Sequence, residues 1–151
     1  MTEIIPSLWF NQNIEEAMKF YTETFPDSSI DNITENDGKV FAAEFTVSGQ
    51  KFHGINAGPE FTFNEAVSFI VTCASQDEVD HYWNTLSAGG SESRCGWLKD
   101  QFGLSWQVVP TRLYELASDP NPARAKGAID AMMTMAKLSI ADLEAGADAA
   151  G

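Results

Sequence analysis

The sequence is poor in the residues that most often form disulfides and metal sites. Its 151 residues include only two cysteines and two histidines. Cys73 and Cys95 do not form a CxxC pair, and we expect free thiols rather than a structural disulfide. A buried packing role is predicted for Cys73. Cys95 lies in a more polar stretch and is the better candidate for a reactive thiol, although packing is favoured there too.

Basic residues are equally scarce. Nine lysines and arginines stand against 22 aspartates and glutamates, which gives a formal net charge of −13. This charge repels phosphate backbones and anionic lipids, so neither nucleic acid nor membrane is expected as a partner. No apolar run reaches the roughly 18 residues that cross a bilayer. The opening residues, MTEIIPSLWFNQN, lack the features of a signal peptide, and we expect a cytoplasmic protein.

Familiar catalytic motifs are missing as well. The chain has no P-loop, HExxH motif, serine-nucleophile elbow or dinucleotide-binding fingerprint. Its 44% apolar and 21% charged residues are ordinary for a globular domain. The composition therefore predicts a folded core but no particular reaction.

The sequence does contain a repeated order of elements, strand, helix and three strands. The first copy is predicted at 4–10, 14–25, 29–35, 40–47 and 51–56, and the second at 66–73, 76–88, 91–98 and 104–109, its last strands being short. Each helix follows a capping-box pattern, Asn13-x-x-Glu16 and Ser75-x-x-Glu78. The copies match at an offset of 62, which places Leu8 opposite Ile70.

This order predicts an α+β fold of two βαβββ modules, at about 1–60 and 64–110. Each sheet buries one face under its own helix, and the other faces curve around a cleft. After Pro110 the pattern changes to helices, with caps at Asn121 and Ser139. Residues 111–151 are therefore predicted to form a C-terminal helical extension.

One segment resembles a known family. Residues 95–110, CGWLKDQFGLSWQVVP, are similar to the signature of the PhnB-like family, also called the 3-demethylubiquinone-9 3-methyltransferase domain, of the vicinal oxygen chelate superfamily. Segments 8–28 (LWFNQNIEEAMKFYTETFPDS), 43–59 (AEFTVSGQKFHGINAGP) and 131–145 (AMMTMAKLSIADLEA) resemble it too. The resemblance implies that 1–110 form a single glyoxalase-like domain, and it implies a homodimer.

Enzymes of this superfamily typically hold a divalent metal with His or Glu side chains from strands of both modules. The resemblance places Pro6, Gly54, Ser68 and Gln107 at those positions. The Gly54 position is uncertain by one residue, with His53 and Asn56 as neighbours. Because these residues are neutral and mostly poor metal ligands, we predict no superfamily-type metal site and no cofactor.

A mostly apolar cleft with neutral hydrogen-bonding groups suits an organic ligand. Gln107 is expected to bond to Ser68, and Trp97 to reach the cleft mouth. If Gly54 faces the cleft, His53 points away from it, and Glu44 is left open as a cleft acid. His81 is expected to be solvated, and the other three tryptophans to lie under helices. The predicted ligand-binding residues are Leu8, Phe10, Gly54, Asn56, Ser68, Ile70, Trp97, Ser105 and Gln107.

Two functions follow from these residues. The first is a metal-independent small-molecule-binding protein. The alternative is a superfamily enzyme, an isomerase, lyase or dioxygenase-like protein, with a displaced metal site. Methyl transfer is disfavoured, because S-adenosylmethionine enzymes typically have a doubly wound sheet and a glycine-rich loop after the first strand. Here that loop is 10–13, FNQN, without glycine.

Overall fold

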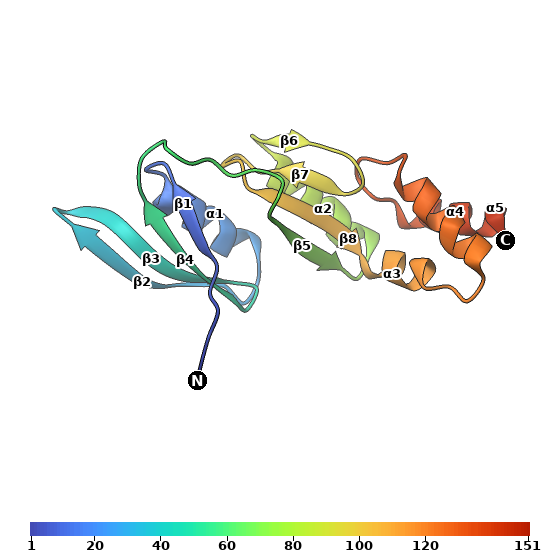
Figure 1. Cartoon of the computed structure of the whole chain (residues 1–151), viewed down its shortest axis with the longest axis horizontal. Coiled ribbons are helices and arrows are strands. Elements are labelled where there is room, and N and C mark those ends of the chain that lie inside the picture. The colour runs from blue at the N-terminus through green and yellow to red at the C-terminus, as the bar shows by residue number, and fades with distance from the viewer. The chain divides into compact units, whose positions relative to one another are not determined.

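The computed structural model describes all 151 residues and divides them into two compact units, Met1–Phe63 and Asn64–Gly151 (Figure 1). Each unit contains a four-stranded mixed sheet and a helix that follows the first strand of that sheet. The predicted fold class, two βαβββ modules with C-terminal helices, is confirmed. No helix is both long and apolar enough to cross a membrane.

The first unit holds one helix and four strands. In chain order they are β1 (Ser7–Phe10), α1 (Ile14–Thr24), β2 (Ser29–Asn36), β3 (Lys39–Val47) and β4 (Gln50–Asn56). The sheet order is β1-β4-β3-β2, with β1 parallel to β4 and the other pairs antiparallel. Every residue of β2 is exposed, so this edge strand contributes little to the core.

Helix α1 covers one face of this sheet. Ala17, Met18 and Tyr21 are buried on the helix, and Ala43 and Phe45 are buried on β3. The predicted cap at the start of this helix is wrong, because the Asn13 side chain makes no capping hydrogen bond. The Ile14 amide instead donates to Oδ1 of Asn56 at 3.0 Å, so the end of β4 caps the helix.

The second unit repeats the arrangement. Its module consists of β5 (Ser68–Cys73), α2 (Gln76–Ser87), β6 (Ser91–Glu92), β7 (Trp97–Lys99) and β8 (Ser105–Pro110), with sheet order β5-β8-β7-β6. The predicted cap of α2 is confirmed, since the Glu78 amide donates to Ser75 Oγ at 3.2 Å. Trp83 and Trp106 are buried between helix and sheet as predicted.

The family-like segment 95–110 makes the β7–β8 hairpin. Asp100 is 2% exposed, and its carboxylate accepts hydrogen bonds from the amides of Phe102 and Leu104 and from Nε1 of Trp106, at 2.8, 3.0 and 2.9 Å. Gly103 closes the turn with φ +86°, a conformation that favours glycine. The most specific motif of the sequence therefore builds a turn and attaches it to the core.

Three helices complete the second unit, namely α3 (Thr111–Ala117), α4 (Pro122–Met132) and α5 (Ile140–Ala150). Leu113, Leu116 and Leu143 form a small core between them. Helices α4 and α5 cross closely at Gly127 and Gly146, where an added Cβ on Gly127 would lie 2.4 Å from the Gly146 carbonyl oxygen. The predicted caps at Asn121 and Ser139 are confirmed.

The segment between α4 and α5 lies against the loop before β7. The amides of Cys95 and Gly96 donate to the carbonyls of Met135 and Ala136, both at 2.8 Å. Gln76 at the start of α2 also bonds to this C-terminal segment. The C-terminal helices thus hold the loop that leads into β7.

The offset of 62 between the modules fits the helices but not the strands. Helices α1 and α2 begin 62 residues apart, whereas β1 and β5 end at Phe10 and Cys73, 63 apart. The extra residue lies in the β1–α1 loop, where Gln12 adopts φ +64°. Since side chains alternate along a strand, this single residue reverses the face assigned to every β1 side chain.

Candidate functional site

The sheet of the second unit has one face packed on α2 and one open face. The open face carries two rows of side chains, because the strand register pairs residues that point the same way. The first row, from β6 inward, is Ser91, Lys99, Ser105 and Ser68. The second row is Trp97, Gln107 and Ile70. Five predicted site residues therefore lie together here: Ser68, Ile70, Trp97, Ser105 and Gln107.

Gln107 and Ser68 are joined by a hydrogen bond. Nε2 of Gln107 donates to Oγ of Ser68 at 2.9 Å. The partner predicted from sequence is the one found. A bond between these neutral groups leaves both side chains partly exposed on the sheet, where a ligand can reach them.

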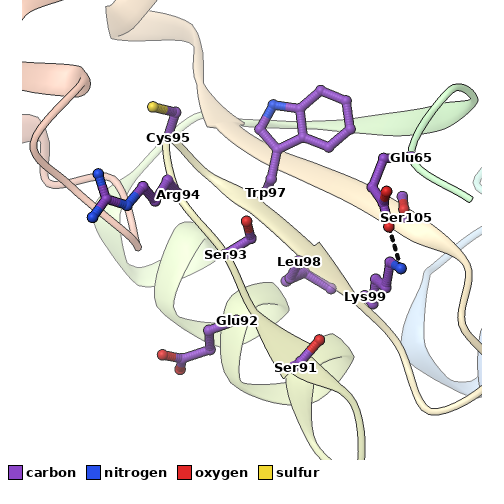
Figure 2. Close-up of a pocket in the computed structure, with 10 residues that line it drawn as sticks. All are labelled: Glu65, Ser91, Glu92, Ser93, Arg94, Cys95, Trp97, Leu98, Lys99 and Ser105. Atoms are coloured by element: carbon purple, nitrogen blue, oxygen red, sulfur yellow. Dashed lines mark ion pairs between the residues drawn. The ribbon is translucent and has the colours of Figure 1, made fainter.

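A pocket of about 520 Å³ opens beside these rows. Its volume falls within the range of small-molecule sites. The lining residues are Glu65, Ser91, Glu92, Ser93, Arg94, Cys95, Trp97, Leu98, Lys99 and Ser105. Figure 2 shows the Trp97 indole and the Glu65–Lys99 pair on the same side of β7, with Arg94 and Glu92 directed away from them.

One ion pair lies at this pocket. The Lys99 ammonium contacts the carboxylate of Glu65, which precedes β5. The hydrogen bond from Lys99 lowers the pKa of Glu65. Both side chains are substantially exposed, 40% for Lys99 and 62% for Glu65, so the pair contributes little to stability and is readily exchanged.

Two further groups of the pocket are uncommitted. The hydroxyl of Ser105 is buried and has no hydrogen-bond partner, which is unusual for a buried polar atom. Arg94 makes no ion pair, whereas Glu92 accepts a hydrogen bond from Nε1 of Trp83 at 3.0 Å. The pocket therefore offers an unpaired hydroxyl and an unpaired cation.

The other four predicted site residues lie on the wrong face of the first sheet. Leu8 and Phe10 are buried on the side of α1. An added Cβ on Gly54 would lie 2.7 Å from Cδ1 of Ile14 and 3.3 Å from Phe10, so Gly54 is where the helix approaches the sheet. Asn56 caps α1 and donates to the Val40 carbonyl. These four residues are structural.

The open face of the first sheet carries His53, which the sequence interpretation directed away from the cleft, and Glu44, which it left open as a cleft acid. Register places Ser7, His53 and Glu44 side by side on β1, β4 and β3. Oγ of Ser7 lies 2.7 Å from Nδ1 of His53. The prediction that Trp9 lies under a helix is wrong. Trp9 is on this open face, where its Nε1 donates to the Gly58 carbonyl and its ring contacts Phe61 edge-on.

The residues at the superfamily's ligand positions do not fit a divalent metal. Ser68 and Gln107 are neutral and bonded to each other, and Gly54 is covered by α1. On β4 the side chain that reaches the open face is that of His53, not Gly54, and it supplies a single imidazole. No group of three or more His, Cys, Asp or Glu side chains converges anywhere in the chain. Hard or borderline divalent metals need more anionic or imidazole ligands than this set supplies.

Comparison with known proteins identifies the module pair. A family model described as 3-demethylubiquinone-9 3-methyltransferase matches residues 2–109, ending before α3. A PhnB protein from Bacillus cereus is 34% identical, with a TM-score of 0.68 over 72% of this chain and 99% of that chain. No curated protein sequence matches.

More distant solved structures have the same fold. Protein PA1353 from Pseudomonas aeruginosa is 22% identical, with a TM-score of 0.58 over 73% of this chain and 98% of its own. The fosfomycin resistance protein FosX from Listeria monocytogenes is 12% identical, with a TM-score of 0.54 over 73% of this chain and 93% of its own. At these identities the likeness concerns the fold alone.

Proposed function

The chain belongs to the 3-demethylubiquinone-9 3-methyltransferase family, within the vicinal oxygen chelate superfamily, and we propose that it binds a small organic molecule without a metal. The binding surface is the open face of the second sheet with its adjoining pocket. The observation that supports this proposal best is the Gln107–Ser68 hydrogen bond, which occupies two metal-ligand positions with neutral groups.

The side chains on this surface suit a partly polar ligand. Trp97 supplies an aromatic platform and Ile70 an exposed apolar contact. The hydroxyls and the Gln107 amide supply hydrogen bonds that fix a ligand's orientation. Binding here uses no metal-coordinating side chains, so we expect added divalent cations to change the affinity little.

Methyl transfer is not part of this proposal, despite the family's name. The two sheets are four-stranded and mixed, with order β1-β4-β3-β2 and β5-β8-β7-β6. Neither has the doubly wound parallel topology of typical S-adenosylmethionine enzymes, and the loop after β1 contains no glycine.

The test combines metal analysis with native mass spectrometry of the purified protein. We expect substoichiometric divalent metal and a bound or exchangeable organic molecule. Stoichiometric zinc, nickel, manganese or iron, lost together with ligand binding after chelation, would overturn the proposal.

A superfamily enzyme, an isomerase, lyase or dioxygenase-like protein with a displaced metal site, is the second candidate, and the Ser7–His53 contact on the open face of the first sheet favours a reactive group there. An imidazole on an open sheet face can act as a general base. If turnover of any substrate is found, His53→Gln abolishes it in this alternative, whereas binding to the second sheet is unaffected.

We also propose that the protein is a cytoplasmic homodimer. Exposed apolar side chains at Ile30, Ile33 and Phe41 on the edge of the first sheet can be covered by a second copy of the chain. Light scattering at micromolar concentration should give about twice the 16.5 kDa chain mass. A single species at the chain mass would rule the dimer out.

A further inference from the structure

We infer that the pocket of the second unit takes a planar aromatic carboxylate, whose ring lies against Trp97 and whose carboxylate replaces that of Glu65 on Lys99. This inference rests on the proposed small-molecule binding and names its ligand class. It depends on the Glu65–Lys99 pair, on the spacing along β7 and on the uncommitted groups of the pocket.

Glu65 shows that a carboxylate fits against Lys99. Its side chain approaches from the segment before β5, outside the sheet, and remains 62% exposed while it contacts the ammonium. An exposed ion pair of this kind is worth little, so a ligand carboxylate that gains further contacts can displace it. Glu65 is therefore a competing carboxylate within the chain.

The further contacts lie close by. Trp97 and Lys99 are two residues apart on β7 and point to the same face, which separates them by roughly 7 Å along the strand. Ser105 is paired with Lys99 in the register, and its buried hydroxyl has no partner. An arene carboxylate can reach from the indole to the ammonium, next to this hydroxyl.

The pocket lining is less acidic than the chain as a whole, whose net charge is −13. Two of the chain's nine basic residues, Lys99 and Arg94, line this pocket. Of the two pocket carboxylates, Glu92 is held by the Trp83 indole, and Glu65 is the displaceable one. Once Glu65 moves away, the Lys99 ammonium is the charge that an incoming carboxylate meets, because Arg94 points away from it.

The test is calorimetric titration of the full chain with 2-naphthoate and with its neutral analogue 2-naphthamide. Wild-type protein should bind the acid more tightly than the amide. Lys99→Met should weaken binding of the acid about tenfold and leave the amide unchanged. Glu65→Gln should tighten binding of the acid by up to about fivefold, because a competitor is removed.

Matched controls come from another exposed pair, Lys126 and Asp130 on α4. Lys126→Met and Asp130→Asn change the net charge by the same amounts as Lys99→Met and Glu65→Gln, but lie outside the pocket. They should leave both affinities unchanged. If they reproduce the effects, overall charge rather than the pocket is responsible, and the inference fails.

The outcomes separate this inference from the proposed function. If both compounds bind equally and Trp97→Ala weakens both, the carboxylate inference is overturned while small-molecule binding stands. If neither compound binds, the inferred ligand class is wrong. Small-molecule binding itself is then tested by whether native mass spectrometry finds a co-purified organic molecule.

Discussion

The buried carboxylate of Asp100 offers the sharpest test of how the family-like segment works. Asp100→Ala removes the acceptor of three hydrogen bonds, two from amides of its own turn and one from the Trp106 indole. Asp100→Asn keeps an oxygen for the turn amides but presents an NH₂ group to the indole N–H. Comparing the two variants therefore separates the contribution of the hydrogen bonds within the turn from that of the hydrogen bond to the Trp106 indole.

The magnitude follows from what each variant leaves unpaired. A buried donor without an acceptor costs about 1–3 kcal/mol. Leu104 and Trp106 are buried, whereas Phe102 is partly exposed and can bond to water. We expect Asp100→Ala to lower the free energy of unfolding by about 3–5 kcal/mol, and Asp100→Asn by about 2 kcal/mol.

Urea unfolding measured by tryptophan fluorescence and circular dichroism gives these values. Trp106→Phe removes the indole donor, so a double-mutant cycle with Asp100→Asn isolates the carboxylate–indole bond. A loss below about 1 kcal/mol for Asp100→Ala would refute the structural interpretation of the segment. Unchanged stability with lost ligand binding would assign Asp100 to the site instead.

Further predictions concern thiols, metal and acid. Burial raises the pKa of the Cys73 thiol to about 11. A disulfide reagent should therefore modify Cys95 alone in the native protein, and both thiols in denaturant. Two reactive thiols in the native state would contradict the packing of Cys73. Gln107→Glu should still bind no divalent metal tightly by calorimetry, because one carboxylate does not complete a site, and micromolar binding would disprove this. Hydrogen bonds from Gln76 and then Lys137 lower the pKa of Asp80. Its contribution to stability is therefore present above the unfolded-state pKa near 3.8 and is lost as the pH falls through the lower folded value. Asp80→Asn should flatten this acid limb of a stability–pH curve, and an unchanged curve would refute the assignment.

The order of elements could be predicted from sequence because its signals are local. Apolar spacing located α1 and α2, and side-chain caps at Ser75, Asn121 and Ser139 located three helix starts. The start of α1 was also predicted correctly, but for the wrong reason. Its cap comes from Asn56, 42 residues away in sequence from Ile14, and no local pattern reveals such a contact.

The faces of the strands were predicted for one sheet and missed for the other. In the second sheet the Ser68–Gln107 partnership was correct. In the first sheet, the offset of 62 that aligns the two helices does not align β1 with β5. The β1–α1 loop has one extra residue, at the left-handed turn of Gln12. A register argument finds the correct face: the hairpin pairs Val47 with Gln50, and counting back along both strands pairs Ala43 with Gly54. Since Ala43 is buried on the face that packs against α1, Gly54 lies on that face too.

This correction exposes what sequence reasoning overlooked. His53 lies opposite Gly54 in the alternation, so it moves to the open face with Ser7 beside it. Pocket residues such as Glu65 lie outside the regular strands, and no periodicity marks them. The contact between Glu65 and Lys99 joins residues 34 apart and depends on the path of the chain before β5.

The most direct test of metal-independent binding is a crystal structure of the chelator-treated protein grown with 2-naphthoate. The account predicts ligand density on the open face of the second sheet, with the ring against Trp97, the carboxylate on Lys99 and an oxygen near Ser105, and no metal between ligand and protein. A ligand bound elsewhere, or one bridged to the protein by a metal ion, would contradict it.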